Sequence, residues 1–123
     1  MSIASGAWAN IPPSQFNYTT SGGALLINMN LVLKDGSHST CQPLIDGQWA
    51  GTYGGLPDAG SPFWREGLQY TGDANFHRWN LSRIYPNIPA GPHTFIIQCS
   101  TNGGVLQVCG GSLGCSWGVV ELH

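Results

Sequence analysis

Apolar and polar residues alternate along much of this chain with a period of two, the spacing that places successive side chains on opposite faces of a β-strand. The clearest run covers residues 24–33. Every second residue from Leu25 to Leu33 is large and apolar there, while Asn28 and Asn30 fall on the opposite face. Similar runs predict further strands, at 37–45, 63–70, 75–85, 93–99, 105–109 and 115–122, with a short one near 3–9.

Glycine and proline punctuate these runs. The chain has 18 glycines and 8 prolines, too many for an amphipathic helix of ordinary length to fit between them. Asp35-Gly36 and Asp46-Gly47 are hairpin-type turn signals, and residues 54–62 are rich enough in both breakers to predict an exposed loop. The pattern predicts an all-β fold, an antiparallel β-sandwich built as a jelly roll of about eight strands.

The chain has 123 residues, which is enough for one domain with a single core. We expect residues 21–123 to form the jelly-roll domain. Residues 1–20 show no strong strand periodicity and are expected to be an N-terminal arm or edge segment, removable without loss of the fold.

The most unusual feature of the composition is its low charge. Charged residues make up 8% of the chain, against about 25% in an average soluble domain. Because a monomer ordinarily uses charge to stay soluble and to protect its sheet edges, this favours a surface covered by identical subunits or by a larger scaffold. The alternative is a secreted domain with a neutral polar surface that faces carbohydrate.

Charge and hydropathy also exclude some partners. The formal net charge is −2 and no two of the four basic residues are adjacent, which argues against nucleic acid. The longest apolar run, around 25–33, is interrupted by Asn28 and Asn30, so no membrane span is expected. The first residues lack a basic leader and a long apolar segment, so we expect no signal peptide.

The chain has four cysteines, which allow three complete pairings: Cys41, Cys99, Cys109 and Cys115. Cys109 and Cys115 bracket a short glycine-rich loop that a disulfide closes easily. If residues 102–104 turn the segment 105–109 back onto 93–99 as a hairpin, Cys109 tends toward the face opposite Cys99. This favours a Cys109–Cys115 bridge, with free buried thiols as the alternative.

Reaction chemistry finds little support in the sequence. Residues 110–114 match the G-x-S-x-G pattern around Ser112, but that motif works on a strand–turn–helix of a large α/β sheet. The histidines are scattered, and His93 follows a Pro-Ala-Gly-Pro turn, as a capping or packed residue would. The acidic residues lie mostly in turns, where Asp is favoured. We therefore expect no catalytic residue, cofactor or metal site, and no enzyme.

The aromatic residues are more suggestive. The chain has five tryptophans, some of which must fill the core while others are suited to subunit contacts. Trp49, Tyr53 and Trp64 flank the loop 54–62 and are the candidate contacts for a glycan or a partner. Core or subunit packing is the favoured interpretation, and a carbohydrate-stacking platform is the alternative.

Four segments resemble sequence motifs of the tumour-necrosis-factor-like jelly-roll family, which includes complement globular heads. The resemblance is to the bacteriophage and bacterial branch of that family. The four segments are Gly22-Gly-Ala-Leu-Leu-Ile-Asn-Met-Asn30, Pro43-Leu-Ile-Asp-Gly47, Ile88-Pro-Ala-Gly-Pro-His-Thr-Phe95 and Trp117-Gly-Val-Val-Glu-Leu122. The resemblance spans residues 22–122 and implies a compact homotrimer with sheet faces packed around a threefold axis. It implies scaffold positions and no catalytic ones.

Together these observations give two expectations of function. The first is a structural virion protein, a trimeric decoration (cement) protein on the exterior of a bacteriophage capsid, bound to the major capsid protein or another virion scaffold. The alternative is the receptor-binding or glycan-binding head of a phage fibre or of a bacterial surface protein, located outside the cell or at its surface.

Overall fold

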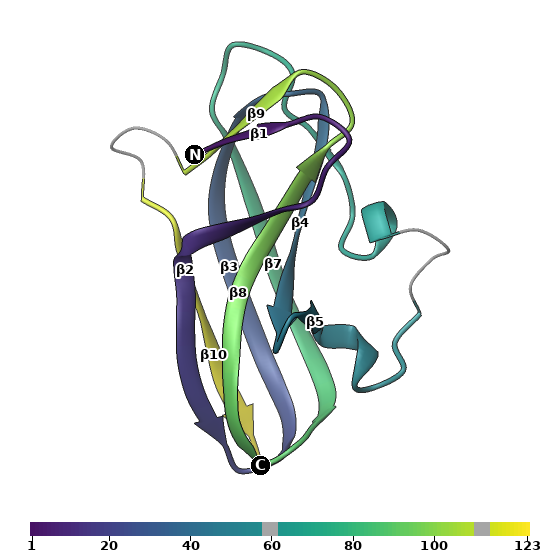
Figure 1. Cartoon of the computed structure of the whole chain (residues 1–123), viewed down its shortest axis with the longest axis vertical. Helices are drawn as coiled ribbons and strands as arrows, with labels where there is room; N and C mark the ends of the chain where they lie inside the picture. Colours follow the sequence, from purple (N-terminus) through teal and green to yellow (C-terminus); the bar gives the residue numbers. More distant parts are fainter. Residues whose placement is uncertain (58–61, 110–113) are drawn as a thin grey trace.

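The computed structural model describes residues 1–57, 62–109 and 114–123, and in this part of the chain ten strands form two antiparallel sheets packed face to face (Figure 1). Sheet A holds β1 (Ser2–Ala4), β9 (Val105–Val108), β3 (Gly23–Asp35), β10 (Ser116–Leu122) and β7 (His77–Ile88). Sheet B holds β2 (Ala9–Thr20), β8 (Gly91–Thr101), β4 (His38–Ile45), β5 (Gln48–Trp49) and β6 (Gln69–Tyr70). The expected all-β sandwich is confirmed.

The strands pair in a nested order. β4 pairs with β5, β3 with β7, β2 with β8 and β1 with β9, all antiparallel. The final strand, β10, pairs with β3 beyond the point where β9 ends. Since β10 and β7 both pair with residues 25–30, they occupy the two opposite edges of β3. Each pair in this order therefore encloses the one before it, as in a long hairpin folded over on itself.

The alternation of β3 builds one wall of the core. Every second residue from Leu25 to Leu33 faces the core and is at most 2% exposed, as the sequence predicts. Across the sandwich they meet the buried residues of β4 and β8, among them Phe95 and Ile97. Burying this face is the main stabilising contribution of the sandwich, at about 25 cal/mol per Å² of apolar surface.

Two turn signals play different roles. Asp46 and Gly47 both have positive φ, at 52° and 83°, and close the β4–β5 hairpin as expected. Asp35 and Gly36 also have positive φ, at 62° and 70°, but they carry the chain from sheet A into sheet B. The turn chemistry is the same, and the sheet change arises because β4 finds its partner in β8.

The expected hairpin of 93–99 with 105–109 is wrong. Residues 102–104 carry the chain from sheet B to sheet A, where β9 pairs with β1 and β3. Cys99 consequently lies opposite Cys41 of β4, and the two form a disulfide in the core that the sequence analysis did not name. The alternation correctly predicted a strand at 105–109, but not which strands pair with it. Alternation determines which face of a strand is buried and does not determine the neighbouring strand.

The expected strand at 63–70 is also wrong. The segment starts as the short 3₁₀-helix η2 (Pro62–Trp64), and only β6 at its end is extended. The N–H of Arg65 donates to the carbonyl of Pro62 at 3.3 Å, and Gly67 has a φ of 85°. Together with η1 (Ala50–Thr52), η2 lies at the side of the sandwich beyond β4 and β5 (Figure 1).

Residues 1–20 are two edge strands in this structure and not a free arm. β1 pairs with β9, and β2 pairs with β8 from Ala9 to Thr20 with a bulge between Ile11 and Phe16. Ile3 and Ile11 belong to the hydrophobic core. Each of the two strands lies at an edge of its sheet, and the Pro12-Pro13 pair explains the weak periodicity of β2.

Candidate binding surfaces

The three aromatic residues nominated from the sequence lie in different environments. Trp49 is only 4% exposed and is covered by the guanidinium groups of Arg65 and Arg83, which lie 4.7 and 5.8 Å from its ring. Tyr53 is half-buried, with its hydroxyl 3.5 Å from the Asp46 carboxylate, whereas Trp64 is 58% exposed. Since a glycan stacks on an open ring face, these three residues do not form one platform.

The cysteines form two disulfides. Cys109 bonds to Cys115, the pair favoured from the sequence, and Cys41 bonds to Cys99. No cysteine is free among the residues that the structure describes. Ser112, the centre of the G-x-S-x-G match, lies outside those residues, as do the middle positions of the loop 54–62.

A pocket of about 370 Å³ lies on the outer face of sheet B, and we call it the amide pocket. Its floor comes from β4 and β8, one wall from the segment that joins β1 to β2, another from β5 and η1, and its rim from η2. The residues that line it combine three glutamines, two tryptophans and one arginine with small and apolar groups: Trp8, Gln42, Leu44, Gly47, Gln48, Trp49, Thr52, Pro62, Arg65 and Gln98.

The floor of the amide pocket carries a ladder of side-chain amides. Asn10, Gln98 and Gln42 are register partners on three neighbouring strands. The Gln42 amide donates to Gln98 Oε1 at 2.8 Å, and the Gln98 amide donates to Asn10 Oδ1 at 3.3 Å. The ladder ends at Gln42, whose remaining atom, Oε1, is buried without a hydrogen-bond partner. Sequence reasoning missed this site because it depends on the register of three strands.

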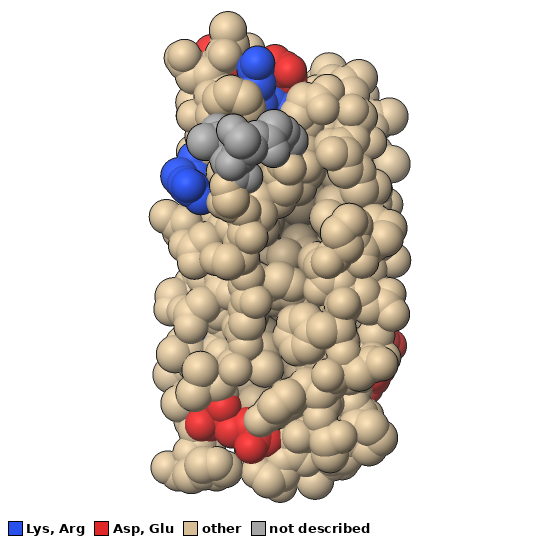
Figure 2. All heavy atoms as spheres, turned by 90° about the vertical axis from the view of Figure 1, so that its left-hand side faces the viewer, with Lys and Arg blue, Asp and Glu red and all other residues tan. Residues whose placement is uncertain are grey.

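A second, larger cavity of about 510 Å³ opens between the two sheets where the edges of β2 and β10 face one another, and we call it the inter-sheet cleft. It is mostly apolar, with buried Leu31, Ile97 and Val108 at its base. Figure 2 shows this side of the molecule, hollowed near its middle, with charged groups confined to its ends and margins.

Ser14 and Trp117 satisfy the polar groups at the mouth of the inter-sheet cleft. The Ser14 hydroxyl donates to the Ile11 carbonyl at 2.6 Å and accepts from the Ile97 N–H at 2.9 Å. This replaces the ladder bonds lost at the β2 bulge. The Trp117 indole donates to the Ser14 carbonyl at 2.9 Å and so ties the two sheets together. The hydroxyl and the carbonyl of Ser14 are thus already paired within the protein.

The outer face of sheet A carries a row of apolar side chains. Leu26 pairs with Ile84 on one side and with Val120 on the other, so the three lie side by side across the sheet. Ile84 and Val120 are 53% and 52% exposed. We call these three residues the apolar row. The next row, Gly118–Asn28–Ser82, is polar but uncharged, with a bond of 2.7 Å from Ser82 to Asn28.

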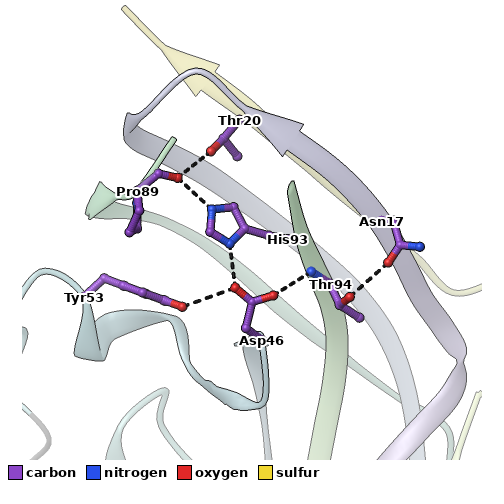
Figure 3. Close-up of polar contacts among 7 residues, drawn as sticks. All are labelled: Asn17, Thr20, Asp46, Tyr53, Pro89, His93 and Thr94. Atoms are coloured by element: carbon purple, nitrogen blue, oxygen red, sulfur yellow. Dashed lines mark hydrogen bonds and ion pairs between the residues drawn. The ribbon is translucent and has the colours of Figure 1, made fainter. Parts of the chain in front are cut away.

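His93, which is itself buried, forms the centre of a polar network at the end of the sandwich (Figure 3). Its Nδ1 lies 2.6 Å from Asp46 Oδ2, and its Nε2 lies 2.6 Å from the Pro89 carbonyl oxygen. A carbonyl oxygen only accepts, and a carboxylate does the same, so each ring nitrogen faces an acceptor and the arrangement favours the imidazolium form of His93. The expected packed or capping histidine is thus also one half of an ion pair.

The network shifts two pKa values in opposite directions. Burial alone would lower the pKa of His93, but its bonds to Asp46 and Pro89 outweigh that effect and raise it. Burial alone would raise the pKa of Asp46, but hydrogen bonds from His93 and from the Thr94 N–H, at 2.8 Å, lower it. Each partner favours the charged form of the other.

A second buried ion pair anchors η2 to sheet A. Glu66, whose side chain is inaccessible to solvent, receives a hydrogen bond of 2.5 Å from Arg83 and another from the Tyr85 hydroxyl. Burial raises the pKa of Glu66, and the bonds from Tyr85 and Arg83 oppose the shift. Burial and the neighbouring Glu66 also raise the pKa of Tyr85. The arrangement holds the Arg83 guanidinium beside Trp49 and is structural.

Within residues 1–57, 62–109 and 114–123, no three His, Cys, Asp or Glu side chains come together in a way that holds a metal ion. No helix in the same part of the chain is long and apolar enough to cross a membrane. In comparisons with known proteins, no family model, no curated protein and no solved structure matches this chain.

Proposed function

We propose that the chain is a jelly roll that assembles into a homotrimer through the outer face of sheet A and serves as a decoration (cement) protein on the exterior of a bacteriophage head. The nested pairing of the strands supports the jelly roll, because that fold is a hairpin of paired strands wrapped into two sheets. The bacteriophage setting rests on the resemblance of residues 22–122 to that branch of the family.

The observation that carries the proposal is the apolar row. Leu26, Ile84 and Val120 place contiguous apolar surface at the centre of a sheet face, where a monomer would be expected to carry charge. The outer positions of β3 from Ala24 to Asn30 and their partners on β7 and β10 hold no charged residue. Such a face packs against the same face of other subunits without burying an unpaired charge.

The low charge of the remaining surface fits the same role. A decoration protein ties neighbouring capsid subunits together, so a large part of its surface is covered by protein. With only 8% charged residues, the chain buries much surface without leaving charges unpaired. The proposed activity is mechanical, because the protein would act by holding neighbouring capsid subunits together.

The first experiment measures oligomeric state by light scattering. We expect a trimer for the intact protein and monomers for Ile84→Asp and Val120→Asp, because each places a carboxylate within the apolar row. Val105→Asp is the matched control: Val105 is 50% exposed on β9, outside the row, and this variant stays trimeric. A monodisperse monomer of the intact protein at micromolar concentration contradicts the proposal.

The second experiment tests the capsid directly. Trimers mixed with phage heads that lack the protein are expected to co-sediment with them and to raise the temperature at which the heads break. The Val120→Asp monomer is expected to bind more weakly, because a trimer attaches at three points. Trimers that leave the heads unbound contradict the decoration role while leaving the assembly intact.

A glycan-binding head of a fibre or a bacterial surface protein is the second candidate function. The observation that favours it is the amide pocket, which combines aromatic rings and amides on a face that the proposed trimer leaves open.

A further inference from the structure

We propose that the amide pocket binds a neutral saccharide, with Trp8 as the stacking surface and the amide ladder as the hydrogen-bonding floor. The inference gives a ligand class to the second candidate function. It holds whether or not the protein decorates a capsid, since the pocket lies on sheet B and the apolar row lies on sheet A.

The pocket has the size and lining of a small-ligand site. About 370 Å³ falls in the range of such pockets, which combine apolar walls with a few convergent polar groups. Its walls come from segments far apart in sequence, Trp8 before β2, Trp49 on β5 and Arg65 after η2. The site therefore exists only in the folded chain.

Trp8 is placed to receive a sugar ring. It is half-buried and packs against Phe63 of η2 in a T-shaped contact, with ring centres 6.0 Å apart, which limits the movement of its ring. A ring held in this way offers flat apolar surface to the C–H groups of a saccharide. Trp49 cannot take this part, because Arg65 and Arg83 cover it.

Gln42, which lines the pocket, has a polar atom without a hydrogen-bond partner. Its side chain is only 4% exposed, and one of its two polar atoms has no partner. Reversing the amides of the ladder exchanges nitrogen for oxygen and still leaves one atom of Gln42 unpaired. An unpaired buried polar atom costs free energy, so a ligand that pairs with it gains affinity.

The chemistry of the lining selects hydroxyl groups. Amides both donate and accept, and a hydroxyl does the same, so Gln42, Gln48 and Gln98 suit a polyol better than an ion. Among the residues that the structure describes, no acidic side chain lines the pocket, which disfavours a cation. Arg65, which also belongs to the lining, lies against the Trp49 ring and supplies further N–H donors.

The test screens the full-length protein on a glycan array that carries neutral and acidic saccharides, followed by titration of the best ligand in solution. We expect neutral glycans to be retained and Trp8→Ala to weaken binding about tenfold or more, as removal of an aromatic anchor does. Gln42→Met, close in volume, is expected to weaken binding similarly. Trp64→Ala is the matched control, since Trp64 is exposed outside the pocket, and it binds as the intact protein does.

The outcomes separate the inference from the assembly proposal. Thermal melting and light scattering of each variant show whether fold and trimer are kept. If Trp8→Ala folds normally and binds glycans as tightly as the intact protein, the inference is wrong. It is equally wrong if no glycan is retained, or if only acidic ones are. A monomeric Val120→Asp that still binds neutral glycans supports the inference and shows that the site needs no partner subunit.

Discussion

At the scale of single residues, the His93–Asp46 pair shows how a small cluster fixes a turn. His93 belongs to β8, Asp46 to the β4–β5 turn and Pro89 to the β7–β8 turn, and the imidazolium ties all three together (Figure 3). Tyr53 and Thr94 complete the network through the same carboxylate. The turn of the β4–β5 hairpin and the β7–β8 turn, which passes from sheet A to sheet B, are thereby held together by one side chain.

The first prediction concerns the pH dependence of stability. Because the folded-state pKa of His93 is raised, its contribution is complete below about pH 6.5 and disappears as the pH rises through the folded pKa. Because the folded-state pKa of Asp46 is lowered, its contribution is complete above about pH 4 and disappears as the pH falls through that pKa. The pair is therefore expected to stabilise the protein most between about pH 4 and 6.5, as measured by urea unfolding across pH.

Substituting His93 tests the cause. His93→Gln keeps a polar side chain and loses the charge, and we expect it to cost about 1–2 kcal/mol near pH 5 and progressively less above pH 7. His38→Gln, at an exposed position on β4, is the control and retains the pH profile of the intact protein. An unchanged profile in His93→Gln would show that other groups set the pH dependence.

At the scale of elements, the two disulfides brace regions of very different size. Cys41 and Cys99 are separated by 58 residues and join adjacent strands inside the core, whereas Cys109 and Cys115 are separated by 6. The loop-entropy relation gives about 4 kcal/mol for the first and about 2 kcal/mol for the second.

The second prediction ranks the disulfides by these loops. The Cys41→Ala/Cys99→Ala variant is expected to lose about 4 kcal/mol of unfolding free energy, and the Cys109→Ala/Cys115→Ala variant about 2 kcal/mol. Guanidinium unfolding of both against the intact protein provides the measurement. If the Cys109–Cys115 variant were the less stable one, the loop argument would fail.

The third prediction concerns residues 1–20. Removing them exposes the edge of β8 and strips Ile3 and Ile11 from the core, so we expect the truncated chain to aggregate or remain unfolded. Circular dichroism and light scattering check this. A truncated chain that folds and stays soluble would restore the arm suggested by the sequence, and its capsid binding could then be measured separately.

The sequence predicted which side chains of a strand face the core better than it predicted which strands are neighbours. The alternation of β3 fixed which of its residues enter the core, because burial needs only a period of two. It did not reveal that β9 leaves β8 for the other sheet, since the turn 102–104 suits a hairpin and a crossing equally. The same gap hid both the Cys41–Cys99 bridge and the amide ladder, which depend on register between strands distant in sequence.

The candidate site shows a related limit. The sequence drew attention to tryptophans around the loop 54–62, and Trp49 does line the amide pocket. What it could not indicate is that two arginines cover Trp49 and that Trp8 approaches from the first residues of the chain. Exposure of an aromatic ring is decided by long-range packing, and no local pattern reports it.

At the scale of the whole molecule, the distribution of charge divides the outer face of sheet A into an apolar part and a charged end. The apolar row lies within an uncharged part of sheet A, while Arg78 and Lys34 lie toward the other end of that sheet, near β9 and the start of β7. Association through the row depends on buried apolar area, at about 25 cal/mol per Å², and association through the charged end depends on Coulomb attraction. Salt distinguishes the two.

The fourth prediction follows from that contrast. In about 1 M sodium chloride the screening length falls to roughly 3 Å, so contacts made by exposed charges weaken while apolar contacts persist. We expect the trimer measured by sedimentation to be as stable in high salt as in low salt, and Ile84→Asp to be monomeric in both. Dissociation of the intact trimer in high salt would place the contact at the charged end of sheet A, around Arg78 and Lys34. The apolar row would then be expected to contact the capsid instead. Exposed apolar surface on a sheet face with no charged residues still requires a partner.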